Sequence, residues 1–194
     1  MTPEEEFLAA RIADPMLRSR DVIEAISLAV AADAKGARES VAALLVDEKR
    51  PPALRRIAAA AFCRLSGRDE GRARFEPAWR LATGDQRAVL GIAIGWWGDV
   101  LEGLDRATGD DDASGWLAVA HTLQLKEALP GIERTIRNPA RHADVRRQAA
   151  EVFRSLTTAD AATRESLRAS SPRDGSSLDD LIELATGAPG QPRL

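Results

Sequence analysis

The chain has almost none of the residues on which disulfide-stapled and metal-bound domains depend. It contains one cysteine, Cys63, and two histidines, His121 and His142, among 194 residues. One cysteine excludes an internal disulfide, and these three side chains match no metal-ligand spacing. Tyrosine is absent, and aromatic residues make up only 4% of the chain. Because strands are rich in aromatic and β-branched residues, this composition argues against a β-sheet fold.

Long apolar runs are also missing. The longest, residues 88–97, is about half the length that spans a bilayer. Residues 1–7 are acidic, where a secretory signal needs a basic start. The 27 Lys and Arg residues are outnumbered by 30 Asp and Glu, whereas nucleic-acid-binding proteins are usually basic. We therefore expect a cytoplasmic protein without membrane contact and disfavour nucleic acid as its partner.

A repeated helical pattern is the strongest positive feature of the sequence. Residues 54–65 and 145–156 share the pattern apolar-Arg-Arg-x-Ala-Ala-x-x-Phe-x-x-Leu, 91 residues apart. Its apolar positions fall on one face of a helix. Looser copies occupy residues 21–30, 86–97 and 114–125, so that the repeat is about 30 residues long.

Each copy is followed by a second, more charged helical segment. Because one helix pair cannot bury its own apolar face, neighbouring pairs must stack. We predict an all-α fold, an α-solenoid of five helix pairs that forms a single domain over residues 1–186, with a flexible tail over 187–194. The predicted second helices, leading helix and C-terminal helix span residues 36–45, 71–81, 99–104, 126–136, 160–167, 3–13 and 178–186.

Two segments carry a resemblance to a known family. Val145-Arg-Arg-Gln-Ala-Ala-Glu-Val-Phe153 and Glu127-Ala-Leu-Pro-Gly-Ile132 resemble the two helices of HEAT-like repeats of the phycobilisome-lyase type. The resemblance covers roughly residues 18–170, although the intermediate copies lack the double arginine. It implies that the Val-Arg-x-x-Ala-Ala helices lie outside and that the second helices line a concave face.

No group of residues indicates catalysis. Cys63 lies inside a predicted core helix, where a packing role is favoured over a reactive thiol. His121 lies in an apolar stretch and is expected to be satisfied or half-exposed, and His142 is expected in a loop or a helix cap. Neither a phosphate-binding glycine loop nor a nucleophile elbow is present. We predict a protein that is not an enzyme and has no catalytic, cofactor-binding or metal-binding residue.

The most concentrated charge is the acidic cluster 110–112. Asp99, Glu102 and Asp105 precede it closely. One interpretation is a solvated loop that contains a helix N-cap, and the other is a patch complementary to a basic partner. A divalent-cation site is the weakest interpretation, because the spacing differs from a calcium loop.

Tryptophans and arginines occur within the repeats. Core packing is the favoured interpretation of the tryptophans. If Trp96 and Trp97 share a helix, however, they point about 100° apart, so that at least one of them reaches a groove or the surface and can act as a binding anchor. The paired arginines are expected to contact carboxylates or helix ends of adjacent repeats, and a phosphate-binding stripe is the competing interpretation. These arginines are Arg55, Arg56, Arg146 and Arg147.

These observations favour a non-catalytic module that binds another protein on its concave face. By analogy, a small acidic array suits an immunity or antitoxin-type protein that neutralises a basic toxin or enzyme by occlusion. The alternative is a HEAT-like enzyme or its remnant, either bilin lyase-like or DNA base-excision-like. The oligomeric state stays open. The predicted partner-binding residues are Arg72, Glu76, Trp79, Arg80, Trp97, Asp99, Glu102, Asp105, Arg106, Asp110, Asp111, Asp112, Glu127, Glu133, Arg134 and Arg137.

Overall fold

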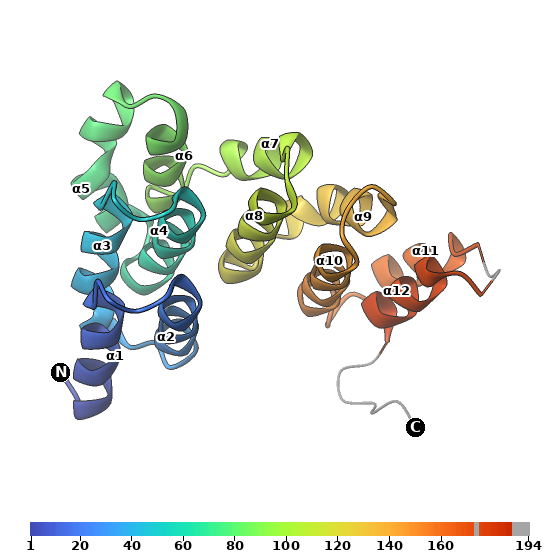
Figure 1. Cartoon of the computed structure of the whole chain (residues 1–194), viewed down its shortest axis with the longest axis horizontal. Helices are drawn as coiled ribbons and strands as arrows, with labels where there is room; N and C mark the ends of the chain where they lie inside the picture. Colours follow the sequence, from blue (N-terminus) through green and yellow to red (C-terminus); the bar gives the residue numbers. More distant parts are fainter. Residues whose placement is uncertain (173–174, 188–194) are drawn as a thin grey trace. The chain divides into compact units, whose positions relative to one another are not determined.

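The protein is all α-helical over the residues that its computed structural model describes, 1–172 and 175–187 (Figure 1). No strand occurs in this part of the chain, which confirms that the fold is all-α. In the same residues, no helix combines the length and the hydrophobicity needed to cross a membrane. Residues 188–194, which belong to the predicted tail, lie outside the described part.

The contacts between residues divide the chain into two compact units. Unit 1, Met1–Val100, contains six α-helices and a short 3-10 helix, η1. In chain order these are α1 (Pro3–Ala13), α2 (Ser19–Ala31), η1 (Lys35–Ala37), α3 (Arg38–Val46), α4 (Pro52–Ser66), α5 (Arg68–Leu81) and α6 (Gly84–Ala93).

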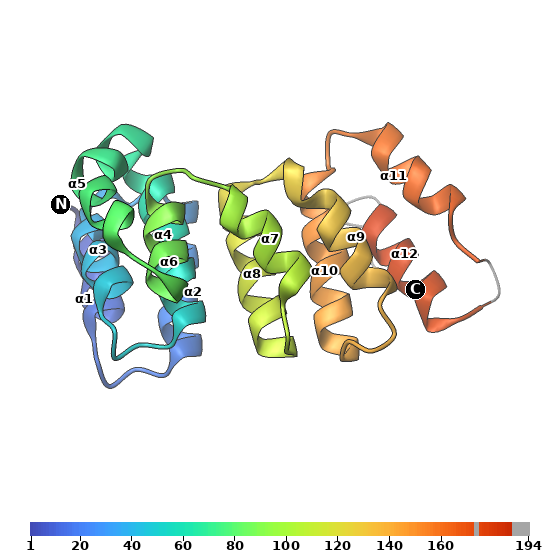
Figure 2. The ribbon, with the colours of Figure 1, turned by 90° about the horizontal axis from the view of Figure 1, so that it is seen from above.

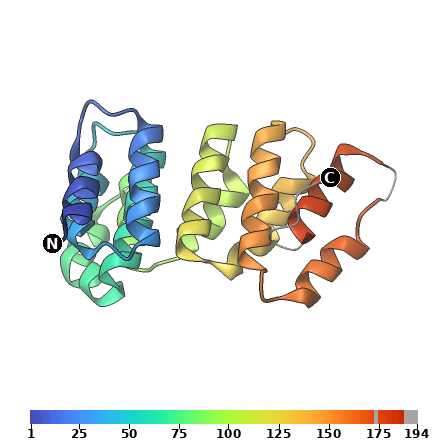
Figure 3. The ribbon, with the colours of Figure 1, turned by 90° about the horizontal axis from the view of Figure 1, so that it is seen from below.

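Unit 2 begins at Leu101, inside helix α7, and presents the same order of elements (Figure 2). Its elements are α7 (Gly98–Arg106), α8 (Asp110–Leu123), η2 (Lys126–Ala128), α9 (Leu129–Arg137), α10 (Ala143–Leu156), α11 (Ala161–Ala169) and α12 (Ser177–Thr186). In unit 1, α4 packs between α2 and α6 (Figure 1), and in unit 2, α10 packs between α8 and α12 (Figure 3).

Every predicted helical segment corresponds to a helix, and the leading helix has the predicted bounds. The segment 86–97 is helical only in its first part, because α6 ends at Ala93. Gly95 then adopts a φ of +81°, a left-handed conformation that interrupts the helix. Trp96 and Trp97 therefore lie in the turn after α6, and the expectation that they share a helix is wrong. The single domain and the solenoid stacking stay predictions.

The repeated apolar positions form the core of each unit, as expected. Leu54, Ala58, Phe62 and Leu65 of α4 are all buried. Their counterparts in α10, which are Val145, Ala149, Phe153 and Leu156, are buried as well. The ring of Phe62 packs edge-on against Phe75 of α5, with 5.3 Å between the ring centroids.

The 91-residue repeat extends well beyond the sequence pattern. The helices α2, α3 and α4 and the turn η1 begin 91 residues before α8, α9, α10 and η2, respectively. Asp33 and Gln124 occupy equivalent positions before the two 3-10 helices, and both are left-handed, with φ of 49° and 53°. Lys49 and Ala140 also correspond, because each backbone N–H donates to a side-chain oxygen two residues earlier at 3.0 Å.

One arginine of each repeated pair contacts the end of the preceding helix, as predicted. The Nε of Arg55 donates to the carbonyl of Leu45 at 3.1 Å, near the C-terminal end of α3. The Nε of Arg146 donates to the carbonyl of Ile136 at 2.9 Å, near the end of α9. A positive charge is favourable at a helix C-terminus, where carbonyl groups lack helical partners.

Candidate functional site

Helices α5 and α6 of unit 1 bring tryptophans and arginines together. We call Arg68, Trp79, Arg87, Trp96 and Trp97 the Trp–Arg cluster. The rings of Trp79 and Trp96 are tilted by 44°, with 6.0 Å between their centroids. The guanidinium of Arg87 lies 4.7 Å from the centroid of Trp79, and that of Arg68 lies 4.8 Å from the centroid of Trp97. Each arginine thus stacks on a tryptophan in a cation–π contact.

The α6 backbone approaches the cluster closely at Gly91. A Cβ atom at this position would lie 3.3 Å from Nε1 of Trp79 and 2.9 Å from Oδ2 of Asp99. The missing side chain therefore lets the indole edge and the carboxylate reach the buried helix. The Nε1 of Trp79 is buried and has no hydrogen-bond acceptor among the described residues. Trp79 is thus the inner member of the cluster.

Trp96 is the outer member of the cluster. Its side chain is 54% exposed, although it packs against Trp79 on one side. Trp97 is half-buried beneath the stacked Arg68. The fourth tryptophan, Trp116, lies in α8 and is buried, so that it belongs to the core of unit 2.

A shallow hollow of about 460 Å³ lies on α5. Three predicted partner-binding residues line it, Arg72, Glu76 and Arg80, together with Ala73 and Pro77. The Nη2 of Arg80 pairs with Oε1 of Glu76 at 2.7 Å. Four-residue spacing on a helix places such side chains in one stripe, so that the sequence itself could reveal this grouping.

The same stripe of α5 leads from the hollow to the Trp–Arg cluster. Arg68 precedes Arg72 by one helical turn, and Trp79 follows Arg68 by three turns, so that all three fall on one side of α5. The cluster and the hollow are therefore adjacent on unit 1. The contacts of Arg68 and Arg87 with tryptophans could not be predicted from the sequence, because they form only when the elements pack together.

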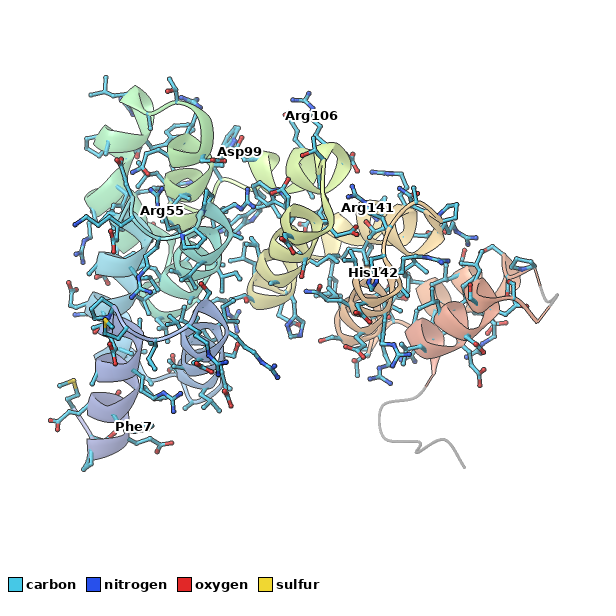
Figure 4. The ribbon with its side chains drawn as sticks, viewed as in Figure 1. Phe7, Arg55, Asp99, Arg106, Arg141 and His142 are labelled. Atoms are coloured by element: carbon cyan, nitrogen blue, oxygen red, sulfur yellow. The ribbon has the colours of Figure 1, made fainter. Side chains whose placement is uncertain are left out.

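The predicted residues of α7 and α9 in unit 2 are already paired with one another. Along α7, Arg106 binds Glu102 at 3.1 Å, and along α9, Arg137 binds Glu133 at 2.9 Å. Arg134 joins the two helices through an ion pair with Asp105. Arg106 projects outward from α7 (Figure 4). Exposed pairs of this kind contribute little to stability, so that they can exchange partners at low cost.

The acidic cluster 110–112 forms the first turn of α8, and the expected solvated loop is wrong. The N-cap is Gly109, which offers no side-chain cap, and a helix N-terminus instead favours the negative charges themselves. Oδ2 of Asp110 also accepts a hydrogen bond from the backbone N–H of His142 at 3.2 Å, and its Oδ1 lies 3.8 Å from Nη1 of Arg141. Arg141 and His142 are labelled in Figure 4. Asp111 is exposed, and so is Glu127 in η2.

The cysteine and the two histidines, which were considered as catalytic or metal-binding residues, have structural surroundings. Cys63 is buried in α4, and this burial raises the pKa of its thiol. The Nε2 of His121 lies 3.1 Å from the hydroxyl of Ser155 on an exposed surface. His142 is the N-cap of α10, where its Nδ1 accepts from the N–H of Asp144, as the cap interpretation predicted. Among the described residues, no three His, Cys, Asp or Glu side chains are grouped to hold a metal ion.

The predicted residues are divided between the two units. The unit 1 group contains Arg72, Glu76, Trp79, Arg80, Trp97 and Asp99, and the other predicted residues belong to unit 2. Comparison of the chain with protein-family models, curated proteins and solved structures finds no match. The geometry of the two groups is thus the basis for any functional conclusion.

Proposed function

We propose that this chain is a non-catalytic protein-binding module. In this proposal, its helix pairs stack as a HEAT-like α-solenoid, and the second helices provide the binding face. The observation that carries the proposal is the Trp–Arg cluster on α5 and α6. Tryptophan and arginine are the residue types most enriched where protein interfaces gain their affinity.

The cluster has the features of an anchor that is organised before binding. Trp96 leaves half of its surface exposed, while its contact with Trp79 restricts its orientation. A large side chain held in place loses little conformational entropy when a partner covers it. Burial of the remaining Trp96 surface excludes water from the stacked Arg68 and Arg87, which strengthens their polar contacts. We therefore expect Trp96 to contribute about 2 kcal/mol or more to binding.

The paired charges of unit 2 suit a second contact region. Exposed ion pairs on α7 and α9, such as Arg134–Asp105, can separate and pair with a partner instead. The acidic first turn of α8 would attract a basic protein and accelerate its association. An immunity or antitoxin-type protein, which neutralises a toxin or enzyme by occlusion, is the subclass that we propose by analogy.

Site-specific photocrosslinking in the cells that produce the protein tests this function. A crosslinking residue replaces Trp96, and the matched control carries it at Phe7. Phe7 is also an exposed aromatic residue of unit 1, 59% exposed, and its ring lies 5.7 Å from Arg11. It belongs to α1 and lies away from Asp99, which is in the first turn of α7 close to Trp97 (Figure 4). We expect one defined protein adduct at position 96 and none at position 7.

Trp96→Ala provides the quantitative version of the same test. Affinity for the crosslinked partner should fall about 30-fold, which corresponds to about 2 kcal/mol. Phe7→Ala should leave the affinity unchanged. An adduct with nucleic acid alone, or equal protein adducts at both positions, contradicts the proposed function.

A further inference from the structure

We infer that the Trp–Arg cluster binds an acidic segment of the partner protein. An apolar side chain of that segment packs on Trp96, and flanking carboxylates pair with Arg68 and Arg87. This inference rests on the proposed function, because it specifies the chemistry of the partner at the proposed site. It differs from the basic partner that the acidic cluster of unit 2 suggests, since the two surfaces carry opposite charge.

The arginines of the cluster lack carboxylate partners within the protein. Among the residues that the structure describes, no Asp or Glu oxygen lies within 4.0 Å of Arg68, Arg72 or Arg87, although all three are exposed. Two other arginines of α5 are paired, because Arg74 binds Glu39 at 3.0 Å and Arg80 binds a glutamate of its own helix. Three exposed arginines without a carboxylate partner among the described residues thus lie on α5 and α6, and two of them contact the tryptophans.

Stacking on the indoles leaves the arginines able to bind a carboxylate. A guanidinium contacts an aromatic ring through its planar face, while its N–H groups point outward along the edge. The Cζ atoms of Arg68 and Arg87 lie over their rings, 4.8 and 4.7 Å from the centroids. Each guanidinium is thus held beside a ring while its N–H groups can still bind a carboxylate. The partner that matches two such groups is anionic.

Trp96 supplies the apolar part of the surface. Its ring is supported by Trp79 and is 54% exposed, so that an aliphatic or aromatic side chain can cover it. One carboxylate oxygen near the cluster, Oδ2 of Asp99, is buried against Gly91. A basic segment would therefore meet two like charges at Arg68 and Arg87. The surface combines an apolar centre with positive flanks.

Selection from a phage-displayed library of random peptides against the full chain tests this inference. We expect the enriched peptides to contain at least two Asp or Glu residues close to an apolar residue. A synthetic peptide of the enriched sequence is then titrated while tryptophan emission is recorded. Its affinity should fall at least tenfold with Arg68→Glu or Arg87→Glu, because each variant places like charges together. Replacement of the peptide carboxylates by amides should have a similar effect.

Arg20→Glu is the matched control for these variants. Arg20 is an exposed arginine of α2, so that its replacement makes the same change in net charge. We expect an unchanged affinity. Raising the salt concentration from about 0.1 M to about 1 M should weaken the wild-type complex, because the screening length falls from about 10 Å to about 3 Å.

Several outcomes would overturn the inference. They are enrichment of neutral or basic peptides, no enrichment at all, or equal loss of affinity with Arg20→Glu. Binding of a single-stranded oligonucleotide or of a second copy of the chain, abolished by the same arginine variants and not by Arg20→Glu, also contradicts it. If any of these results occurs while a protein still crosslinks at position 96, the acidic-segment inference fails alone. If no protein crosslinks at position 96, the proposed function itself is wrong.

Discussion

Residues 19–66 and 110–157 have the same backbone plan and different surfaces. Both segments contain three α-helices, a left-handed residue, a 3-10 turn and an arginine that binds the preceding helix end. Around them, unit 1 contains every large hydrophobic residue that is exposed in the described part of the chain, Trp96 among them. Unit 2 has exposed ion pairs on α7 and α9 and no exposed large hydrophobic residue in its described part. A repeated frame thus supports two surfaces of different chemistry.

The largest expected difference between the two segments lies in their core phenylalanines. Phe62→Ala should destabilise the protein by about 4–5 kcal/mol and Phe153→Ala by about 3–4 kcal/mol, because each leaves a cavity. Phe62 also loses its edge-on contact with Phe75, which Phe153 does not have among the described residues. Urea unfolding followed by circular dichroism measures both values. Phe62→Leu and Phe153→Leu are milder controls. Equal losses of stability for the two alanine variants would contradict the predicted difference between the two phenylalanines.

Substitutions of the repeated arginines should have smaller effects on stability. We expect Arg55→Met to lower the free energy of unfolding by about 2 kcal/mol and Arg146→Met by about 1 kcal/mol, because each removes a charged donor from a helix end. The larger loss falls on Arg55, which is 5% exposed and also donates to Gln86, whereas Arg146 is half-buried. Chemical denaturation provides the measurement. An equal or larger loss for Arg146 would contradict the greater contribution assigned to the buried Arg55.

The left-handed residues offer a test of the shared backbone. Replacing Asp33 or Gln124 by glycine should stabilise the protein by about 0.5–1 kcal/mol, because glycine adopts a positive φ without steric cost. The gain should be smaller for Gln124, whose side chain donates to the carbonyl of His121 at 2.9 Å. Ala32→Gly, at a right-handed residue, should be destabilising. Thermal unfolding distinguishes the three variants, and a loss on glycine substitution at both left-handed positions would contradict the shared geometry.

Acidification should affect one helix start in each unit. Hydrogen bonds from the backbone N–H groups of Thr2 and Gly36 lower the pKa of Glu5, and bonds from Thr163 lower the pKa of Asp160. A lowered pKa in the folded state means that the stabilisation is present above the ordinary carboxyl pKa. It is lost as the pH falls through the lowered value.

Glu5→Gln and Asp160→Asn should therefore reduce the melting temperature slightly at pH 7. Below the lowered carboxyl pKa values, each variant should approach the wild type, because the wild-type carboxyl is then protonated as well. Both side chains are at the surface, so that we expect the smallest effects here. Melting curves from pH 7 to pH 2 test this, with Glu4→Gln in the same first turn as a control. Differences that persist at the lowest pH would contradict the assignment.

The helices were largely predictable from the sequence. Leading helix α1 begins after Thr2, whose side chain accepts from the N–H of Glu5, and its bounds agree with the prediction. The role of Arg55 at a helix end could be anticipated because the arginine pair recurs with the repeat. The acidic residues 110–112 were misplaced in a loop, since a run of aspartates is equally typical of a loop and of a first helical turn.

The candidate site was only half predictable. Trp79 and Trp97 were expected as binding residues, but the helix expected over 86–97 ends before Trp96, because one glycine, Gly95, interrupts an otherwise apolar run. The stacking of Arg87 on Trp79 joins α6 to α5. Such a pair has no signature in spacing, because its two members belong to different helices.

The sequence by itself determined the helices, their order and the 91-residue repeat, because the burial of one helical face is written in the local spacing of apolar residues. Tertiary structure alone decided which polar and aromatic side chains meet. Arg87 reaches Trp79 only when α5 and α6 pack, and Asp105 pairs with Arg134 only when α7 lies beside α9. Contacts between helices depend on distances in space, which the spacing along a single helix does not contain.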